Sequence, residues 1–114
     1  MNESQFPWLI LVPSINNIRE LHDLSTEQQV SLIQETSTVS ELLLAHFQAD
    51  KINIGALGNL VPQFHMHVVV RHEHDVAWPN PVWGNYSPQP YAKPDSDSQK
   101  NQLVALLKDH PRGL

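Results

Sequence analysis

Residues 63–71 read Gln63-Phe64-His65-Met66-His67-Val68-Val69-Val70-Arg71, and polar and apolar side chains alternate through the sixth of them. An alternation with a period of two is typical of a β-strand that has one solvated face and one buried face. The pattern places Gln63, His65 and His67 on the solvated face and turns the apolar side chains between them into a core. The two imidazoles then lie roughly 7 Å apart along a rigid element. Because imidazole is both a nucleophile and a proton carrier near neutral pH, this strand is the first candidate for a chemical site.

Length and composition limit the class of protein. The 114 residues, of which 40% are hydrophobic, predict a single domain over 1–114 with one core between two layers. The chain has no cysteine, which excludes disulfides and thiolate metal sites and favours a reducing compartment. No apolar run approaches ~20 residues, so we expect a soluble, cytoplasmic protein without a membrane partner. The net charge of -5 argues against nucleic-acid binding, although a small anionic substrate needs only a few well-placed donors.

Two further apolar runs predict strands beside the first one. The run 8–12 is closed by Pro13, and the run 52–57 is separated from the strand 64–71 by turn residues at 58–59. Gly-Asn between two apolar runs is typical of an antiparallel hairpin. We therefore expect a small antiparallel sheet.

Two helices are expected to accompany this sheet. Ser25 and Gln28 have the spacing of a capping box, and a helix follows to about residue 48. The residues of its apolar stripe recur every three or four positions, so we expect one face of this helix to pack on a flat surface. The stripe consists of Leu32, Thr36, Val39, Leu43 and Phe47. A second helix is predicted over 96–110, capped by Ser96 and stopped by Pro111. Together the elements predict an α+β fold, with an antiparallel sheet packed against one long helix.

The composition changes between the sheet and the last helix. Residues 73–95 hold five of the nine prolines, with Trp78, Trp83, Tyr86 and Tyr91 among them. Proline at this density cannot join the interior of a sheet. We expect a stiff loop that is folded over a surface, with the aromatic side chains anchoring it.

These motifs together resemble the histidine triad (HIT) family of nucleotide hydrolases and transferases. The family signature is His-x-His-x-His followed by two apolar residues, often ending in Pro-Arg, and residues 63–71 follow it with glutamine in the first place. The segment Asn53-Ile54-Gly55 and the runs 8–13 and 18–24 also resemble the family. The resemblance covers roughly residues 7–75, and the run 78–84 resembles a bacterial branch.

The resemblance implies an activity and a set of site residues. In relatives the middle histidine attacks the α-phosphate of a nucleotide, and water then releases a nucleoside monophosphate from the nucleotidyl-histidine. His65 takes the place of this nucleophile, and His67 that of the third histidine, which orients the substrate. Asn53 matches an asparagine that contacts phosphate or ribose. From its strand parity we expect Arg71 near the same phosphate. The implied substrate is a dinucleoside polyphosphate, such as diadenosine tetraphosphate, or a nucleoside phosphoramidate.

The resemblance also implies partners. Relatives are two-fold homodimers whose sheets join across the interface, so we expect a homodimer. The family works without a bound metal, so no cofactor is expected. His72 and His74 suggest a zinc site together with His65 and His67, but strand parity places the two pairs on opposite faces. The aromatic side chains of the loop could stack on a nucleobase, although anchoring is the interpretation we favour.

Departures from the family pattern leave alternatives open. Gln63 donates and accepts hydrogen bonds but cannot carry a proton, and Leu60 replaces a polar residue that could donate to phosphate. The family fold also usually begins with strands ahead of residues 8–12. A nucleotide-binding or scaffold protein that kept the pocket but lost catalysis is therefore the main alternative. A further alternative is a metal-dependent, cupin-like enzyme with Glu73 as a ligand. That fold is an all-β barrel, which does not fit the long predicted helix.

Overall fold

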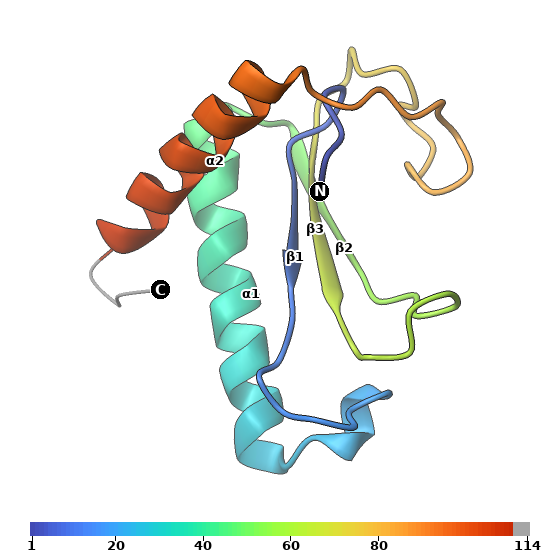
Figure 1. Cartoon of the computed structure of the whole chain (residues 1–114), viewed down its shortest axis with the longest axis vertical. Coiled ribbons are helices and arrows are strands. Elements are labelled where there is room, and N and C mark those ends of the chain that lie inside the picture. Colours follow the sequence, from blue (N-terminus) through green and yellow to red (C-terminus); the bar gives the residue numbers. More distant parts are fainter. Residues whose placement is uncertain (111–114) are drawn as a thin grey trace.

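A three-stranded antiparallel sheet lies against a long helix in the computed structural model, which describes residues 1–110 (Figure 1). The elements in chain order are β1 (Trp8–Leu11), a 3-10 helix (Leu21–Asp23), α1 (Thr26–His46), β2 (Lys51–Gly55), β3 (Met66–Arg71) and α2 (Lys93–Lys108). The strand order is β1-β3-β2, so β3 is central and pairs with both neighbours. This architecture confirms the predicted α+β fold. Within residues 1–110, no helix has the length and apolar character needed to cross a membrane.

The register of the sheet fixes which side chains lie beside the histidines. In β3, His67 is paired with Ile10 of β1 and with Gly55 of β2. Two residues further along, Val69 is paired with Trp8 and Asn53. Because side chains alternate along a strand, all of these residues belong to one face of the sheet.

The other face of the sheet packs on α1. Met66, Val68 and Val70 are each at most 7% exposed and meet the buried stripe of the helix, which includes Leu32 and Leu43. Each apolar side chain buried in this way stabilises the fold by roughly 1.5–3 kcal/mol. The predicted capping box begins the helix. Ser25 Oγ accepts from the backbone N–H of Gln28 at 3.2 Å, and Gln28 Oε1 accepts from the N–H of Ser25 at 2.8 Å.

The prediction that β3 has one solvated face is wrong. All six residues from Met66 to Arg71 are buried, because the segment 73–95 folds over the face that carries the histidines. Phe6, Trp8 and Val69 form a core with residues of that segment. Trp83 and Tyr86 pack on this core, as the anchoring role predicted for the aromatic side chains requires.

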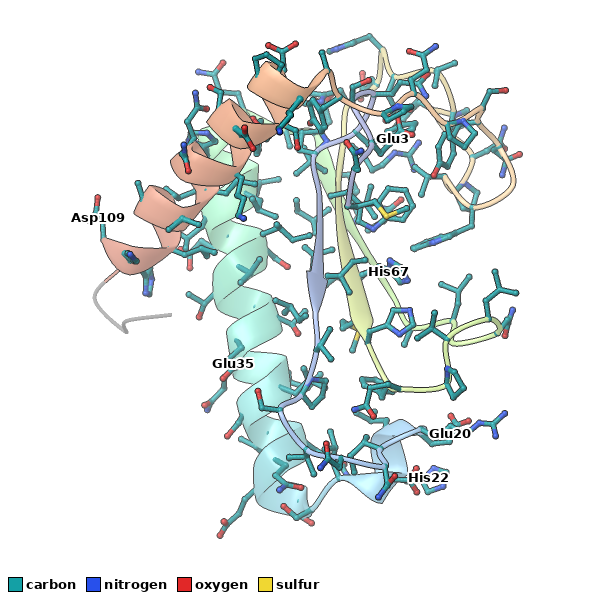
Figure 2. All side chains as sticks on the ribbon, in the orientation of Figure 1. Glu3, Glu20, His22, Glu35, His67 and Asp109 are labelled. Carbon is teal, nitrogen blue, oxygen red and sulfur yellow. The ribbon has the colours of Figure 1, made fainter. Side chains whose placement is uncertain are left out.

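The N-terminal residues hold the covering segment in place. Ser4 donates two hydrogen bonds to this segment, because its backbone N–H and its hydroxyl both donate to the Gln89 carbonyl oxygen, at 2.8 and 2.6 Å. The carboxylate of Glu3, only 1% exposed, accepts from the Gln89 N–H at 3.0 Å (Figure 2). These contacts join residues more than 80 positions apart, which explains why strand alternation alone could not reveal the cover.

The C-terminal helix differs from the prediction at both ends. The helix begins at Lys93 rather than Ser96, because Pro94 lacks an N–H and suits a first helical turn. Ala92 is the N-cap, and the N–H of Ser96 donates to the Ala92 carbonyl as part of that turn. The helix ends at Lys108, and Pro111 lies outside the described residues.

The hairpin between the second and third strands is wider than a tight turn. The strand β2 ends at Gly55 and β3 begins only at Met66, so residues 56–65 form a loop. Gly58, at φ 69°, adopts a left-handed conformation that favours glycine. The antiparallel pairing of the two strands is as predicted.

Candidate active site

The two histidines of the motif lie together at the beginning of the central strand. His65 immediately precedes β3, and His67 is its second residue. Their ring centroids are 5.0 Å apart with the planes at 69°. His65 is half-buried and His67 is 8% exposed. Figure 2 shows His67 on the side of β3 that faces away from α1.

A backbone carbonyl sets the tautomer of His65. The distance from His65 Nδ1 to the carbonyl oxygen of Gln63 is 2.8 Å. A carbonyl oxygen can only accept, so Nδ1 carries the proton and donates. The Nε2 atom is therefore left with its lone pair, as a nucleophile requires. This acceptor could not be identified from the alternation, because the chain bends at residue 63 instead of continuing the strand.

A tryptophan sets the opposite tautomer of His67. The indole Nε1–H of Trp8 donates to His67 Nδ1 at 3.0 Å. An indole nitrogen cannot accept, so Nδ1 of the imidazole is unprotonated and the neutral ring carries its proton on Nε2. The two rings thus offer a lone pair on His65 Nε2 and a donor on His67 Nε2. Sequence reasoning assigned Trp8 only to a strand. Its part in the site depends on the register of β1 with β3.

Burial lowers the pKa of His67 below its usual value. The positive charges of a protonated His65 and of the N-terminal amino group lower this pKa further. His67 is therefore held neutral to a lower pH than a free imidazole would be. A neutral ring keeps its Nδ1 available to accept from Trp8.

Folding stability is expected to fall as the pH drops through 6.5, the ordinary histidine pKa. In this range the unfolded chain binds a proton at His67 that the folded protein does not. The free energy of unfolding therefore rises with pH across the window. Urea unfolding of the wild type and of His67→Gln, measured from about pH 8 to about pH 5, checks this. The wild type should lose more stability than the variant, and parallel profiles would contradict the assignment.

The side chain of Gln63 is engaged at the edge of the site. Its Nε2 donates to the carbonyl oxygen of Ile15 at 3.0 Å, which ties the segment after β1 to the residues that precede β3. The residue thus orients His65 through its backbone and the neighbouring loop through its amide. Leu60, by contrast, is 95% exposed on the loop between β2 and β3.

Asn53 and Arg71 are brought together with each other and with Asp75. The guanidinium of Arg71 donates from Nε and Nη2 to the two Asp75 oxygens at 2.8 and 3.0 Å, and from Nη1 to Asn53 Oδ1 at 2.8 Å. Arg71 is 1% exposed, and the rings of Phe6 and Trp78 lie 5.7 and 5.6 Å from its guanidinium carbon. This network fixes the amide of Asn53 with its Nδ2 turned away from the guanidinium. Contact of Asn53 or Arg71 with a substrate stays a prediction.

The carboxyl group of Asp75 is held in its charged form. Burial alone would raise the pKa of Asp75, but the hydrogen bond from Arg71, those from the His72 and Trp78 backbone and the guanidinium charge together lower it. The backbone N–H groups of His72, Ala77 and Trp78 donate to this carboxylate at 3.2, 3.1 and 2.8 Å. Asp75 therefore fixes the start of the covering segment as well as the side chain of Arg71.

Gly55 has no room for a side chain beside the site. A Cβ atom built on Gly55 would lie 2.9 Å from the Trp83 ring, which also packs edge-on to His67 at 5.6 Å between centroids. We expect Gly55→Ala to lower the free energy of unfolding by about 1–3 kcal/mol, since Trp83 would have to move. Adding Trp83→Phe to Gly55→Ala should recover part of this loss in a double-mutant cycle. Additive effects of the two substitutions would contradict the steric explanation.

The histidines beyond the strand contact each other and the end of α1. His72 and His74 stack on each other, with centroids 5.0 Å apart, and His72 Nε2 lies 3.1 Å from the Phe47 carbonyl oxygen. This contact directs His72 toward the end of α1 and away from His65. Among residues 1–110, no three His, Asp or Glu side chains converge in the manner of a metal site.

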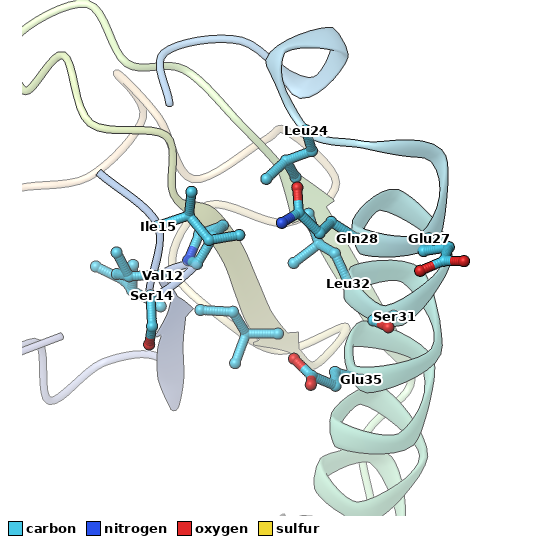
Figure 3. A pocket seen from close by; sticks show the side chains of 12 residues that line it. Val12, Ser14, Ile15, Leu24, Glu27, Gln28, Ser31, Leu32 and Glu35 are labelled. Atoms are coloured by element: carbon cyan, nitrogen blue, oxygen red, sulfur yellow. The ribbon is translucent and has the colours of Figure 1, made fainter. Parts of the chain in front are cut away.

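A cavity of about 560 Å³ lies between the end of β1 and the first half of α1. Its lining includes Ile10, Val12 and Leu32 together with Glu27 and Glu35. Figure 3 shows the Glu35 carboxylate turned toward the cavity. A negative charge there repels phosphate, so the cavity suits an anionic substrate less well than the histidine pair does.

The fold and the paired imidazoles define a class of protein, an α+β domain with histidine chemistry at the start of its central strand. Residues 1–74 match the HIT domain. The match spans more than half of the chain, and the chain belongs to the HIT family. Membership supports a function of the nucleotide hydrolase or transferase type, and HIT proteins bind nucleotides.

Solved bacterial histidine triad proteins are similar to this chain along most of its length. The protein of Marinobacter aquaeolei is 47% identical, with a TM-score of 0.90, over 95% of this chain and 79% of its own. The protein of Sinorhizobium meliloti is 41% identical, with a TM-score of 0.87, over 94% and 79%. The protein of Bradyrhizobium japonicum is 42% identical, with a TM-score of 0.83, over 93% and 77%. Comparison with curated proteins gives no match.

Proposed function

We propose that this protein cleaves a nucleotide at its α-phosphate through a nucleotidyl-histidine intermediate on His65. The hydrogen bond from His65 Nδ1 to the Gln63 carbonyl oxygen carries this proposal, because it leaves the Nε2 lone pair free to attack. The half-buried position of His65 supports it further, since the ring is held by the fold and still reaches solvent.

The reaction takes place in two balanced steps. In the first, the lone pair of His65 Nε2 forms a bond to the α-phosphorus, and the bond from phosphorus to the leaving group breaks with its electron pair on the leaving group. In the second, a water oxygen attacks the same phosphorus, the P–N bond breaks, and the electron pair returns to Nε2. The nucleoside monophosphate leaves, and the proton lost by water passes to the solvent. His67 donates from Nε2 to a phosphoryl oxygen during both steps.

Gln63 favours a polyphosphate leaving group over an amine. An amine must be protonated to leave, and an amide side chain carries no proton to give. A nucleoside polyphosphate leaves as a stable anion without that help. We therefore propose a dinucleoside polyphosphate as the preferred substrate, with a nucleoside phosphoramidate turned over more slowly.

One experiment separates the enzyme from the scaffold alternative. A panel of adenosine and guanosine dinucleoside polyphosphates and phosphoramidates is incubated with the protein, and nucleoside monophosphate release is followed by chromatography. Calorimetry with AMP is run on the same sample. We expect both product and binding. Binding without product would favour a scaffold that lost catalysis, and absence of both would overturn a nucleotide function.

We further propose that the protein is a homodimer. Val30, Ile33 and Leu44 are 50%, 53% and 41% exposed at spacings that place them on one side of α1, and Ile54 of the edge strand β2 is 50% exposed. Apolar side chains on a helix beside an open strand edge are suited to a second copy of the chain. Sedimentation equilibrium should give twice the mass of the chain. Ile33→Glu should shift the protein toward the monomer, whereas Glu35→Gln should not.

A further inference from the structure

We propose that Trp8 is a positioning residue that holds His67 as its Nε2–H tautomer, so that this ring meets a substrate only as a hydrogen-bond donor. The catalytic consequence rests on the function proposed above. The tautomer assignment does not depend on that function, because it follows from the contact between the side chains of Trp8 and His67.

Only one direction is possible for the hydrogen bond between Trp8 and His67. Trp8 Nε1 lies 3.0 Å from His67 Nδ1, and the indole nitrogen can only donate. A hydroxyl or amide in the same place could donate or accept, and the tautomer would then stay undetermined. Both side chains are buried, at 4% and 8% exposure, so water competes little for this bond.

Aromatic rings keep the His67 imidazole in this orientation. Its ring centroid lies 5.6 Å from that of Trp8 and 5.6 Å from that of Trp83, with the planes at 66° and 76°. The two indoles pack edge-on against each other at 5.9 Å. A ring flip of His67 would break the bond to Trp8 and disturb this packing, so the Nδ1 edge stays turned to Trp8 and the Nε2 edge is left for a substrate.

The same bond opposes protonation of His67. A proton on Nδ1 would face the indole N–H, so the imidazolium forms only if the bond to Trp8 breaks. Burial and the charges of His65 and of the Met1 amino group act in the same direction, by lowering the pKa of His67. His67 therefore remains a neutral donor to a lower pH than an ordinary imidazole would.

Nitrogen NMR of the protein labelled with ¹⁵N at histidine and tryptophan tests the proposal without any substrate. In the wild type, we expect His67 to show the Nε2–H pattern and a scalar coupling between Trp8 Nε1 and His67 Nδ1 across the hydrogen bond. An Nδ1–H pattern for His67, or no such coupling, would overturn the proposal. This measurement requires no substituted protein and is therefore independent of whether a variant folds.

Trp8→Phe keeps an aromatic ring but removes the donor. In this variant we expect a mixture of His67 tautomers and a higher His67 pKa in the NMR titration. Trp83→Phe is the matched control, because Trp83 touches the same imidazole only through its ring, and it should keep the Nε2–H tautomer. An unchanged tautomer in folded Trp8→Phe would contradict the role assigned to the indole.

The kinetic readout separates positioning from general damage. We expect Trp8→Phe to lower kcat by about tenfold while KM changes less than about twofold, because the donor on His67 acts mainly on the transition state. The acidic limb of its rate profile should shift upward with the His67 pKa. If the wild type turns over no nucleotide, the proposed function fails, whereas the NMR result still decides the tautomer.

Discussion

His65→Ala is expected to lower kcat/KM for nucleoside monophosphate release by at least about a thousandfold, because it removes the lone pair that we propose as the nucleophile toward phosphorus. The substitution leaves the Gln63 carbonyl and the Trp8–His67 pair in place, so the fold of the site should survive. AMP binding by calorimetry is expected to stay within about fivefold of the wild type, since a nucleophile contributes more to the transition state than to the ground state.

His74→Ala is the matched control for this loss. It removes the same side chain from an exposed position whose ring stacks on His72 and not on the site. Its kcat/KM should stay within about twofold of the wild type. Retention of a tenth or more of the wild-type rate by His65→Ala would mean that another group is the nucleophile.

The second large effect is expected at the buried ion pair between Arg71 and Asp75. Arg71→Met should lower the free energy of unfolding by about 3–5 kcal/mol, because it leaves the Asp75 carboxylate buried without its counter-charge. The side chains of the pair are only 2% and 6% exposed, so solvent screens the lost charge poorly. Urea unfolding measures the change.

The double variant Arg71→Met/Asp75→Leu distinguishes charge from packing. It removes the uncompensated carboxylate and should recover part of the stability lost in Arg71→Met. Asp75 also accepts from three backbone N–H groups, so recovery is expected to be partial. A loss below about 1 kcal/mol in Arg71→Met would show that the ion pair adds little to the fold.

The ion pair also supports the candidate site through Asn53. Arg71 Nη1 donates to Asn53 Oδ1 and so fixes which end of the amide can donate to a substrate. Arg71 has the strand parity expected from the sequence, but the sequence suggested a residue that meets phosphate directly. Asp75, four residues later, was not identified as its partner. The pairing of Arg71 with Asp75 depends on the turn that follows β3. The alternation of polar and apolar residues along the strand says nothing about that turn.

The sequence predicted most of what depends on local pattern. The alternation over residues 63–71 correctly placed both histidines on one face, and their rings lie 5.0 Å apart. The capping box at Ser25 is also as predicted, and so is the buried stripe of the long helix from Leu32 to Leu43, whereas Phe47 is the half-buried C-cap. These features depend on residues within a few positions of one another, so a single segment is sufficient to predict them.

The features that the sequence did not predict depend on distant contacts. Trp8 and His67 are 59 positions apart, and only the pairing of β1 with β3 brings the indole to the imidazole. The sequence predicted that the segment 73–95 folds over a surface but not that this surface is the histidine face, which depends on contacts such as those of Glu3 and Ser4 with Gln89. The start of α2 was predicted wrongly for a local reason. Ser96 was chosen as the N-cap, although Pro94, two positions before it, suits the first helical turn.

Direct detection of the covalent intermediate tests the role of His65 most directly. The protein is mixed with a dinucleoside polyphosphate, quenched within milliseconds at low temperature and at alkaline pH, where phosphohistidine bonds last longest, and digested for mass spectrometry. We expect a nucleotidyl group on the peptide that contains His65, localised to that residue by fragmentation and absent from His65→Ala. Turnover without an adduct on His65, or with the adduct on His67, would contradict it.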